Sequence, residues 1–187
     1  MHTMIALMLG GMLAAPAIPY VDEKAAPQDL VESIKTRRPG NKLLNLDLML
    51  LNSPEFAKGW NAMFGAIRGK LAVPAKLREI SIMTIAVLNH ADYEWLQHEP
   101  EFLKAGGTKE ELAAIKKLSD KPFDEAGKAA MHLTIEMTRD VKVKPATMKR
   151  VKAVLPNDQA VELIGTIAGY NMVSRFLIAT GIEAETP

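Results

Sequence analysis

The sequence predicts an all-α protein, because helix signals follow one another along the chain without an interrupting strand pattern. Prolines and short polar residues stand where helices would begin, and glycines stand where several would end. Apolar residues recur at helical spacing, for example in the segment from residue 126 to residue 137. Alternating apolar and polar runs, which mark half-buried strands, are absent from the sequence. The expected architecture is therefore helices packed on helices around one core.

In the first half of the chain, the expected helices cover residues 27–38, 42–51, 53–68 and 74–88. Pro39 and Gly40 stop the first of them. Ser53 has the character of an N-cap, with Pro54 at the first helical position. The segment 80–88 has no charged residue, so this part of its helix is expected to be central and buried.

In the second half, the expected helices cover residues 92–104, a helix after Thr108, and residues 122–139, 145–155 and 156–181. Asp92 is the expected cap of the first of these, and two glycines at 106 and 107 end it. Thr108 followed by Glu111 forms a capping-box pattern. Nothing in this half suggests a strand.

Composition excludes several classes of function. The 187 residues carry a formal net charge of +1, so no bulk field favours nucleic acid or an anionic membrane, and we expect neither as a partner. The chain has no cysteine, which removes disulfides, thiolate catalysis and thiolate metal sites. No glycine-rich phosphate loop precedes a helix, and no cofactor is expected.

The N-terminal segment is set apart by an apolar run from Met4 to Ala15. It has the length of a secretory core segment, but residues 1–3 before it carry no Lys or Arg, and it is too short to span a membrane. We therefore interpret residues 1–17 as an extension, either a signal or a mis-assigned start with Met12 as the true one. Residues 18–187 form the expected domain, located in the cytoplasm unless the extension directs export.

Two helical segments, 80–88 and 161–178, are broadly apolar. Together they present more apolar surface than a small monomer easily covers. A homo-oligomer is the natural way to bury it, so self-association is expected.

Glu94 and His98 are the clearest candidates for chemistry. They lie four residues apart on one expected helix and therefore share a face, with Tyr93 beside them. A histidine next to a carboxylate can be tuned across neutral pH and can act as a general acid or base. The competing interpretation is an exposed Glu–His pair on a helix surface, which is common in proteins.

Glu79 and Arg175 are charged residues in apolar surroundings. Glu79 comes just before the uncharged segment, where a carboxylate either finds a partner or shifts its pKa upward, unless it is simply exposed in the first turn. Arg175 is the only charged residue between Leu163 and Ile182, and a guanidinium in such a helix needs a carboxylate. That carboxylate is either Glu79 or Glu94, or it belongs to a substrate. Asn171 lies one turn earlier on the same face.

Glu94 and His98, together with His90, also suggest a possible metal site. His90, Glu94 and His98 are spaced by four, so neighbouring pairs could share a zinc ion if one helix carried all three. His90 falls at the expected helix break, however, and three ligands spread over two turns do not converge. No metal is expected.

Three segments resemble a known family. LREISIMTIAVLNHADYEWLQHEPEFLKAGG, residues 77–107, resembles the core motif of the carboxymuconolactone decarboxylase-like and alkyl hydroperoxidase D-like proteins. GYNMVSRFLIATGIE, residues 169–183, resembles their closing helix, and LLNLDLMLLNSPEFAKGWNAMFGAIR, residues 43–68, resembles their N-terminal helical pair. The likeness covers about residues 18–183 and implies the alkyl hydroperoxidase D-like helical fold.

The resemblance also shows what this chain lacks. In the peroxidase branch, a Glu is followed by two Cys and then a His, at spacings of twelve, three and four. Glu79 and His98 match the ends of that pattern, while Ala91 and Glu94 stand where the cysteines would be. Tyr93 stands where the branch often has a second His. Peroxide reduction by thiols needs a nucleophilic and a resolving cysteine, so that activity is not expected here.

The decarboxylase branch implies acid–base chemistry on a small lactone acid from aromatic-ring catabolism. By this resemblance His98 would transfer the proton, assisted by Glu94 and Glu79. Arg175 and Asn171 would hold a substrate carboxylate, and Tyr93 and Trp60 complete the candidate substrate-binding set. The expected function is thus a cofactor-free lyase or isomerase acting on a small organic acid or lactone. Two alternatives stay open: a cysteine-less antioxidant relative of the peroxidases, and a non-catalytic helical oligomer.

Overall fold

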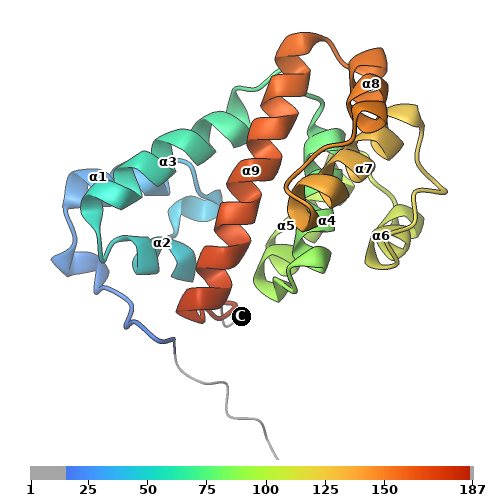
Figure 1. Ribbon diagram of the computed structural model, residues 1–187. Coiled ribbons are helices and arrows are strands. Elements are labelled where there is room, and N and C mark those ends of the chain that lie inside the picture. Colours follow the sequence, from blue (N-terminus) through green and yellow to red (C-terminus); the bar gives the residue numbers. More distant parts are fainter. Residues whose placement is uncertain (1–15, 186–187) are drawn as a thin grey trace, which may run out of the picture.

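The computed structural model describes residues 16–185, and every regular element in that range is helical (Figure 1). The α-helices are α1 (Gln28–Lys35), α2 (Asn45–Leu50), α3 (Pro54–Gly69), α4 (Ala75–Leu88), α5 (Asp92–Lys104), α6 (Lys109–Lys116), α7 (Glu125–Arg139), α8 (Pro145–Val154) and α9 (Asn157–Thr180). Two short 3-10 helices, Glu23–Ala25 and Pro39–Asn41, precede α1 and α2. The predicted all-α class is confirmed.

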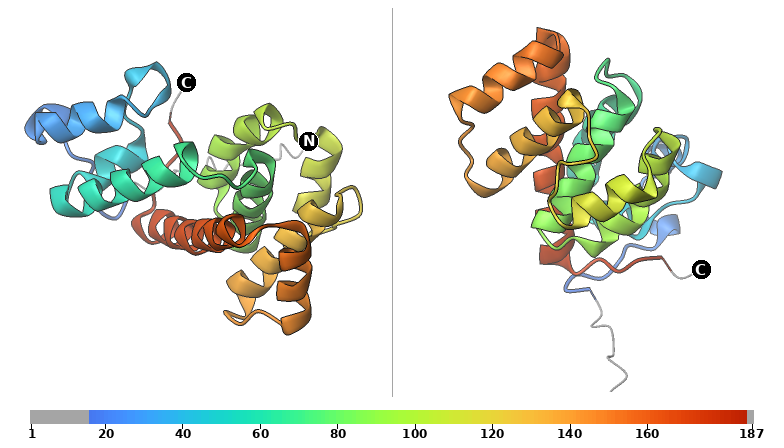
Figure 2. Two further views of the ribbon diagram at one scale, coloured as in Figure 1. Left: turned by 90° about the horizontal axis from the view of Figure 1, so that it is seen from above. Right: turned by 90° about the vertical axis from the view of Figure 1, so that its right-hand side faces the viewer.

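Helix α9 runs between two groups of helices (Figure 1). Helices α1, α2 and α3 lie on one side of it and α4 to α8 on the other, and the view from above in Figure 2 shows the same division. Helix α4 packs against α5, α6, α7 and α9, which makes it the central helix of the second group. The candidate site lies where the two groups meet.

Helix α4 is buried because its sequence leaves it no polar face. Its residues from Glu79 to Ala86 are all buried, as the uncharged segment predicted. Its two buried hydroxyl residues differ, since Thr84 donates to the carbonyl of Ile80 at 2.7 Å while the hydroxyl of Ser81 has no partner among the described residues. The helix ends at Asn89, as expected.

Helix ends follow the predicted capping residues in part. The capping box at the start of α6 is confirmed, because the Thr108 hydroxyl accepts from the Glu111 N–H at 3.1 Å and Glu111 accepts from the Thr108 N–H at 2.9 Å. The cap expected of Ser53 is wrong in detail, since its side chain accepts no capping hydrogen bond. Asp92 lies inside the first turn of α5, and Ala91 takes the cap position.

Two helices start later than the sequence suggested. Helix α2 begins at Asn45 rather than residue 42, because Gly40 has a φ of 65° and the chain stays extended through Leu44. Helix α7 begins at Glu125 rather than residue 122, because Asp124 caps it by accepting from the Gly127 N–H at 2.8 Å.

Close contact between α3 and α9 sets one wall of the site. Gly169 of α9 faces Phe64 and Ile67 of α3, and a Cβ on Gly169 would lie 3.3 Å from the end of the Ile67 side chain. Because glycine has no side chain at this point, the two helices approach closely, and the wall carries residues from both.

The N-terminal interpretation lies mostly outside the described residues, which begin at Pro16. At that edge, the Ala17 N–H donates to the Thr180 carbonyl at 3.0 Å, so the start of the described chain packs on the end of α9. Between residues 16 and 185, no helix is both long enough and apolar enough to cross a membrane.

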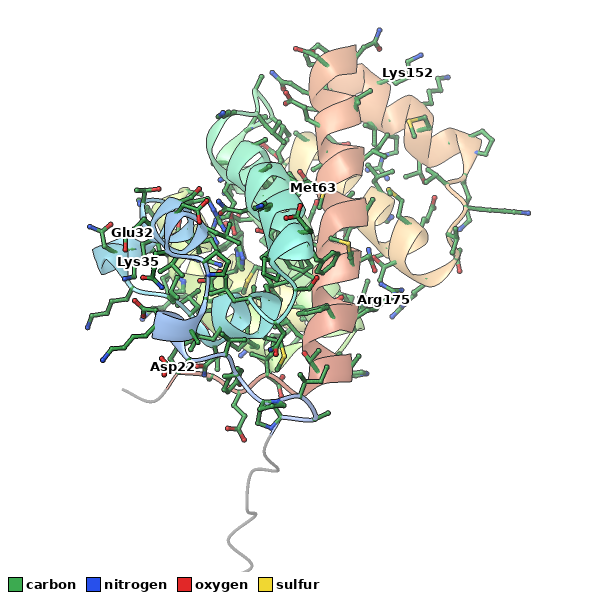
Figure 3. The ribbon with its side chains drawn as sticks, turned by 90° about the vertical axis from the view of Figure 1, so that its left-hand side faces the viewer. Asp22, Glu32, Lys35, Met63, Lys152 and Arg175 are labelled. Atoms are coloured by element: carbon green, nitrogen blue, oxygen red, sulfur yellow. The ribbon has the colours of Figure 1, made fainter. Side chains whose placement is uncertain are left out.

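Exposed apolar side chains bear on the expected self-association. The segment 80–88 gives no such surface, because its apolar residues are covered within the chain. Helix α9 does expose Met172 and Ile178, and α3 exposes Phe56 and Met63. Figure 3 shows Met63 on α3 beside α9. The ring of Phe56 lies 6.0 Å from that of Phe176, so α3 and α9 contribute to one surface. Helix α4 therefore offers no large exposed apolar side chain for self-association, and association through the α3–α9 surface stays a prediction.

Met63→Glu should weaken any homo-oligomer, because a charge buried at an apolar interface costs several kcal/mol unless it is paired. Light scattering at micromolar concentration measures the change in mass. Val141→Glu is the matched control, since Val141 is 84% exposed and follows α7, so it belongs to neither α3 nor α9. A wild-type chain that is monomeric throughout, or a mass that Met63→Glu leaves unchanged, would contradict the prediction.

Candidate functional site

Helix α5 turns the Glu94–His98 face inward. Glu94 is 4% exposed and His98 is 2% exposed, so the interpretation of a solvent-exposed Glu–His pair is wrong. The reason lies in the rest of the helix: Tyr93 and Phe102 share the buried side, while Asp92 and Leu96 are exposed. The four-residue spacing therefore places both titratable groups against the centre of the molecule.

His98 is held by a carboxylate from the central helix. Its Nδ1 lies 2.7 Å from Oε2 of Glu79, and Glu79 is itself 2% exposed. The other carboxylate oxygen of Glu79 lies 3.3 Å from Nε of Arg78. The edge of the His98 ring meets Tyr170 of α9, with ring centroids 5.2 Å apart. A histidine fixed in this way presents its Nε2 in one direction only.

Glu94 is the group that Nε2 faces. The distance from His98 Nε2 to Glu94 Oε2 is 3.4 Å, and this oxygen has no hydrogen-bond partner among the described residues. Most buried side-chain oxygens in folded proteins are paired, and leaving one unpaired costs free energy. Glu94 is therefore a buried acid whose Oε2 faces His98 without a hydrogen bond.

The pKa values of Glu79 and Glu94 are shifted in opposite directions. Burial alone would raise the pKa of Glu79, but the hydrogen bond and charge of His98, with Arg78, hold that pKa below its usual range. Burial raises the pKa of Glu94, and the charge of His98 offsets this only in part. Two carboxyls around one imidazole with separated pKa values are typical of acid–base sites, in which one stays ionised while the other can carry a proton.

A small cavity of about 30 Å³ adjoins Glu94 and His98, room for one or two water molecules. Its apolar lining consists of Leu44, Leu46, Trp60, Phe64, Tyr170 and Val173. Its polar lining consists of Arg37, Arg38, Arg68, Tyr93, Glu94, Gln97 and His98. Of the sequence candidates, it brings together His98, Glu94, Tyr93 and Trp60. Glu79 lies behind His98 and does not line the cavity.

Arg175 does not join the site. Its side chain is exposed on α9 (Figure 3) and donates to Asn171, at 2.6 Å to Oδ1 and 2.9 Å to the backbone carbonyl. The expected pairing of Arg175 with Glu79 or Glu94 is therefore wrong. Asn171 also lies elsewhere, bonded to Thr138 and Asn89. Helix α9 is apolar nearly all round, so its sequence does not indicate which side faces solvent.

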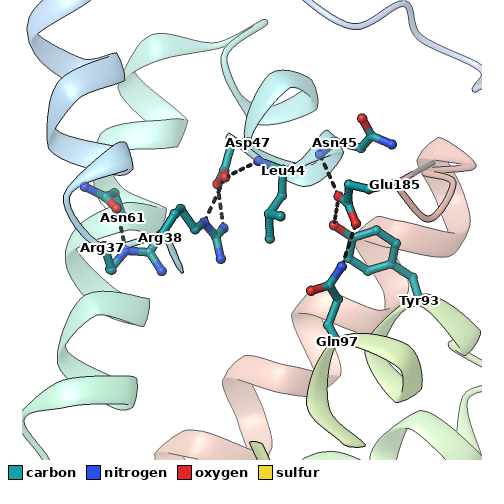
Figure 4. Close-up of polar contacts among 9 residues, drawn as sticks. All are labelled: Arg37, Arg38, Leu44, Asn45, Asp47, Asn61, Tyr93, Gln97 and Glu185. Atoms are coloured by element: carbon teal, nitrogen blue, oxygen red, sulfur yellow. Dashed lines mark hydrogen bonds and ion pairs between the residues drawn. The ribbon is translucent and has the colours of Figure 1, made fainter. Parts of the chain in front are cut away.

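Three other arginines line the cavity, and the sequence analysis did not single them out. Arg38 is buried and forms an ion pair with Asp47, at 2.5 Å from Nη2 to Oδ1 and 2.8 Å from Nε to Oδ2. Arg37 donates to Asn61 at 2.7 Å, and burial with the nearby charge of Arg38 lowers the pKa of Arg37 to about 10. Figure 4 shows these contacts.

Arg68 is half-buried, and its side chain has no ion pair or hydrogen bond within residues 16–185. Its position in the last turn of α3 gave no signal in the sequence, because arginine is common at helix C-termini. Only Arg38 of the three has a carboxylate partner here, so the cavity wall carries two guanidinium groups, those of Arg37 and Arg68, without an ion pair among the described residues.

The C-terminal tail supplies a further residue that the sequence analysis missed. Glu185 accepts hydrogen bonds from Tyr93 and Gln97 of α5 and from the backbone of Asn45 (Figure 4). Tyr93 and Gln97 line the cavity, so the tail lies across one of its walls. A contact between residues so far apart in sequence leaves no local pattern.

His90, the third residue of the possible metal site, lies apart from Glu94 and His98. His90 has a φ of 55° and lies in the turn before α5, outside the cavity lining. Across the part of the chain that the structure describes, no group of three or more His, Asp or Glu side chains is placed to hold a metal ion.

The segment that holds the site matches a known protein family. The model of the carboxymuconolactone decarboxylase family matches residues 54–134, which run from α3 into α7 and include Glu79, Glu94 and His98. No curated protein matches the chain.

Solved structures with the same fold cover nearly the whole chain. A peroxidase-related protein from Ralstonia eutropha JMP134, described as an alkylhydroperoxidase AhpD core, aligns with a TM-score of 0.79 and 13% identity over 92% of this chain and 93% of its own. A peroxidase-related protein from Silicibacter sp. TM1040 aligns with a TM-score of 0.78 and 14% identity over 97% and 96%. The debrominase Bmp8, in complex with 2,3,4-tribromopyrrole, aligns with a TM-score of 0.75 and 16% identity over 91% and 92%.

At these identities the structural likeness establishes the fold, while the family match rests on the segment that holds the Glu79–His98–Glu94 cluster. The resemblance drawn from the sequence is thereby confirmed: the chain carries the core of the carboxymuconolactone decarboxylase family over residues 54–134, on an alkyl hydroperoxidase D-like helical fold and without any cysteine.

Proposed function

We propose that the protein is a cofactor-free lyase or isomerase that acts on a small organic acid or lactone by acid–base catalysis. The observation that carries the proposal is the carboxyl of Glu94, which is buried at the cavity. Its Oε2 lies 3.4 Å from His98 Nε2 and has no hydrogen-bond partner within residues 16–185. Folding stability alone gives no reason to keep such a group. A carboxyl in this position can donate a proton to, or accept one from, a substrate beside the oriented imidazole of His98.

The roles follow from the contacts. With the Nδ1–H of His98 donated to Glu79, Nε2 carries the lone pair and can accept a proton from Glu94 or from a substrate carbon. Glu79 stabilises the imidazolium that forms and acts as a positioning residue. In a decarboxylation, the bond to the substrate carboxylate breaks, CO₂ leaves, and the electron pair stays conjugated with a neighbouring carbonyl until protonated Glu94 supplies a proton to the carbon.

Positive charge around the cavity supports an acidic substrate. Arg37 and Arg68 line it without a carboxylate partner among the described residues, so either can hold an anion or the oxygen on which negative charge develops. They take the place that the sequence analysis gave to Arg175. The debrominase of this fold was found with a small heterocycle, which agrees with a small-molecule ligand here.

The two alternative functions, a non-catalytic oligomer and an antioxidant relative of the peroxidases, would give these residues other roles. A non-catalytic oligomer would use Glu79, His98 and Glu94 as an internal ion network, in which each carboxylate contributes to stability. A cysteine-less antioxidant relative of the peroxidases would need a peroxide chemistry that depends on neither of the missing thiols.

Glu94→Gln should abolish turnover. The assay is proton NMR in D₂O on a panel of small lactone acids and keto acids, which detects decarboxylation, isomerisation and exchange at carbon in one experiment. Glu99→Gln is the matched control, because Glu99 lies on the same helix, accepts from Trp95 at 2.7 Å and does not line the cavity. The control should retain activity. Equal activity of wild type and Glu94→Gln on every substrate that the wild type turns over would contradict the proposal.

The same variant should be more stable than wild type at pH 8. Burial raises the pKa of Glu94, so its favourable contribution is complete below the unfolded-state pKa and is lost as pH rises through the folded-state pKa. Glutamine does not ionise and avoids that loss, which should raise Tm at pH 8 by roughly 2–4 °C, about 1 kcal/mol. The advantage should vanish near pH 4. If Glu94 instead belonged to a stabilising ion network, Glu94→Gln would lower Tm at pH 8.

His98→Ala should cost about 3 kcal/mol of stability, because it leaves the buried carboxylate of Glu79 with Arg78 as its remaining partner. Denaturant unfolding measures the loss. His98→Gln keeps an N–H donor in reach of Glu79 and should retain more of the stability, yet it cannot take up a proton and should be as inactive as His98→Ala. Activity in His98→Gln would remove the imidazole from the mechanism.

Pure protein should not reduce peroxides at the expense of a dithiol donor, because the chain holds no cysteine to form the required intermediates. A coupled assay with hydrogen peroxide and a dithiol measures this. Turnover above the uncatalysed rate would favour the antioxidant alternative over the lyase.

A further inference from the structure

Helix α5 presents two parallel rows of polar side chains to the cavity. Glu94 and His98 form one row, and Tyr93 and Gln97, each one residue earlier, form the next. Residues four apart stack along a helix, whereas neighbours in sequence lie about 100° apart round it. The two rows therefore flank one cavity from two sides, and a ligand held there by the second row can reach the acid–base groups of the first.

The second row already holds a carboxylate, that of Glu185. Its Oε1 accepts from the Tyr93 hydroxyl at 2.7 Å and from the Asn45 N–H at 2.9 Å, and its Oε2 accepts from Gln97 Nε2 at 2.6 Å (Figure 4). These three donors, from α2 and α5, are here called the cradle. Its geometry satisfies both oxygens of a single carboxylate, and charge-assisted bonds of this kind are the strong ones.

The donors are suited to an anion. Tyr93 is 7% exposed, and burial together with the carboxylate of Glu185 raises its pKa, so the hydroxyl keeps its proton. Beyond the cradle, Arg37 and Arg68 line the same cavity and have no carboxylate partner within residues 16–185. A negative group is thus favoured in this region both by hydrogen bonds and by the surrounding charge.

The space beside the cradle is small. The cavity measures about 30 Å³, so an organic acid that reaches Glu94 and His98 gains room when part of the chain at its edge moves aside. Glu185 is the natural part to move, because it lies on the irregular segment after α9. That segment is tied nearby by the bonds from Asn45 to the Glu183 carbonyl and from the Glu183 N–H to Tyr20.

We propose that the cradle of Asn45, Tyr93 and Gln97 is a carboxylate-binding subsite of the cavity, and that Glu185 occupies it in place of an acid ligand. This deepens the proposed function and rests on it for the reaction, but the binding step stands by itself. The ligand is a small carboxylic acid whose carboxylate takes the three donors and whose adjacent carbon then faces Glu94 and His98. Glu185 competes with it from within the chain.

Titration with succinate, followed by NMR of the Gln97 side-chain amide and the Trp60 indole, tests the subsite. Glu185→Ala should bind succinate roughly tenfold more tightly than wild type, because the internal competitor is gone. Adding Gln97→Ala or Tyr93→Phe to Glu185→Ala should reverse most of that gain. Glu183→Ala is the control in the same tail, since Glu183 contributes backbone groups rather than its carboxylate, and it should bind as wild type does.

Three results would overturn the subsite: equal affinity of wild type and Glu185→Ala, a gain that survives removal of Gln97 and of the Tyr93 hydroxyl, or no binding to any variant at millimolar succinate. Equal binding of the neutral analogue succinamide would do the same, because the cradle would then not select a carboxylate. The Glu185→Ala variant, which keeps Glu79, Glu94 and His98, separates the two proposals. If it binds succinate but turns over none of the tested acids, the subsite stands and only the lyase is removed.

Discussion

The bond between His98 and Glu79 is the constraint on which the site depends. Glu79 enters the core on α4, whose following residues leave no polar surface, so its carboxylate needs a donor within reach. His98 provides that donor from α5 at 2.7 Å. Once α5 is placed to do so, its helical spacing also brings Glu94 into the interior, and the neighbouring row with Tyr93 and Gln97 reaches the cavity. One buried hydrogen bond thus positions both the acid–base pair and the cradle.

Other buried carboxylates in this fold accept hydrogen bonds, in contrast to Glu94. Asp47 receives Arg38 and the Leu44 N–H. Glu136, in α7, accepts from the Lys144 N–H at 2.8 Å and from the Thr147 hydroxyl at 2.8 Å. The fold therefore has the means to satisfy a buried carboxylate, and it does not use them at Glu94. An unpaired buried acid next to an oriented imidazole is better explained by chemistry than by packing.

Local sequence patterns were sufficient for most helices and for half of the site. Proline and capping residues placed α3, α5, α6, α8 and α9 within a residue or so, and spacing by four paired Glu94 with His98. The rest needed tertiary structure. Arg68 and Glu185 approach α5 only because α3 and the tail fold back on it, and no periodicity records that. The site role predicted for Arg175 was wrong, because the sequence of a helix that is apolar on every side does not indicate which side is buried.

The two rows on α5 would serve different functions in a catalytic site, one binding the anion and the other transferring protons. Tyr93 and Gln97 are hydrogen-bond donors that keep one charge state near neutral pH, which suits the recognition of an anion that must be bound and released unchanged. Glu94 and His98 can each gain or lose a proton, which suits the step in which a bond is made or broken. Because the rows share one backbone, the separation between the bound carboxylate and the proton donor is set by helix geometry and not by loop flexibility. Because both rows line the same cavity, a carboxylate bound by Tyr93 and Gln97 favours acids that react close to that carboxylate.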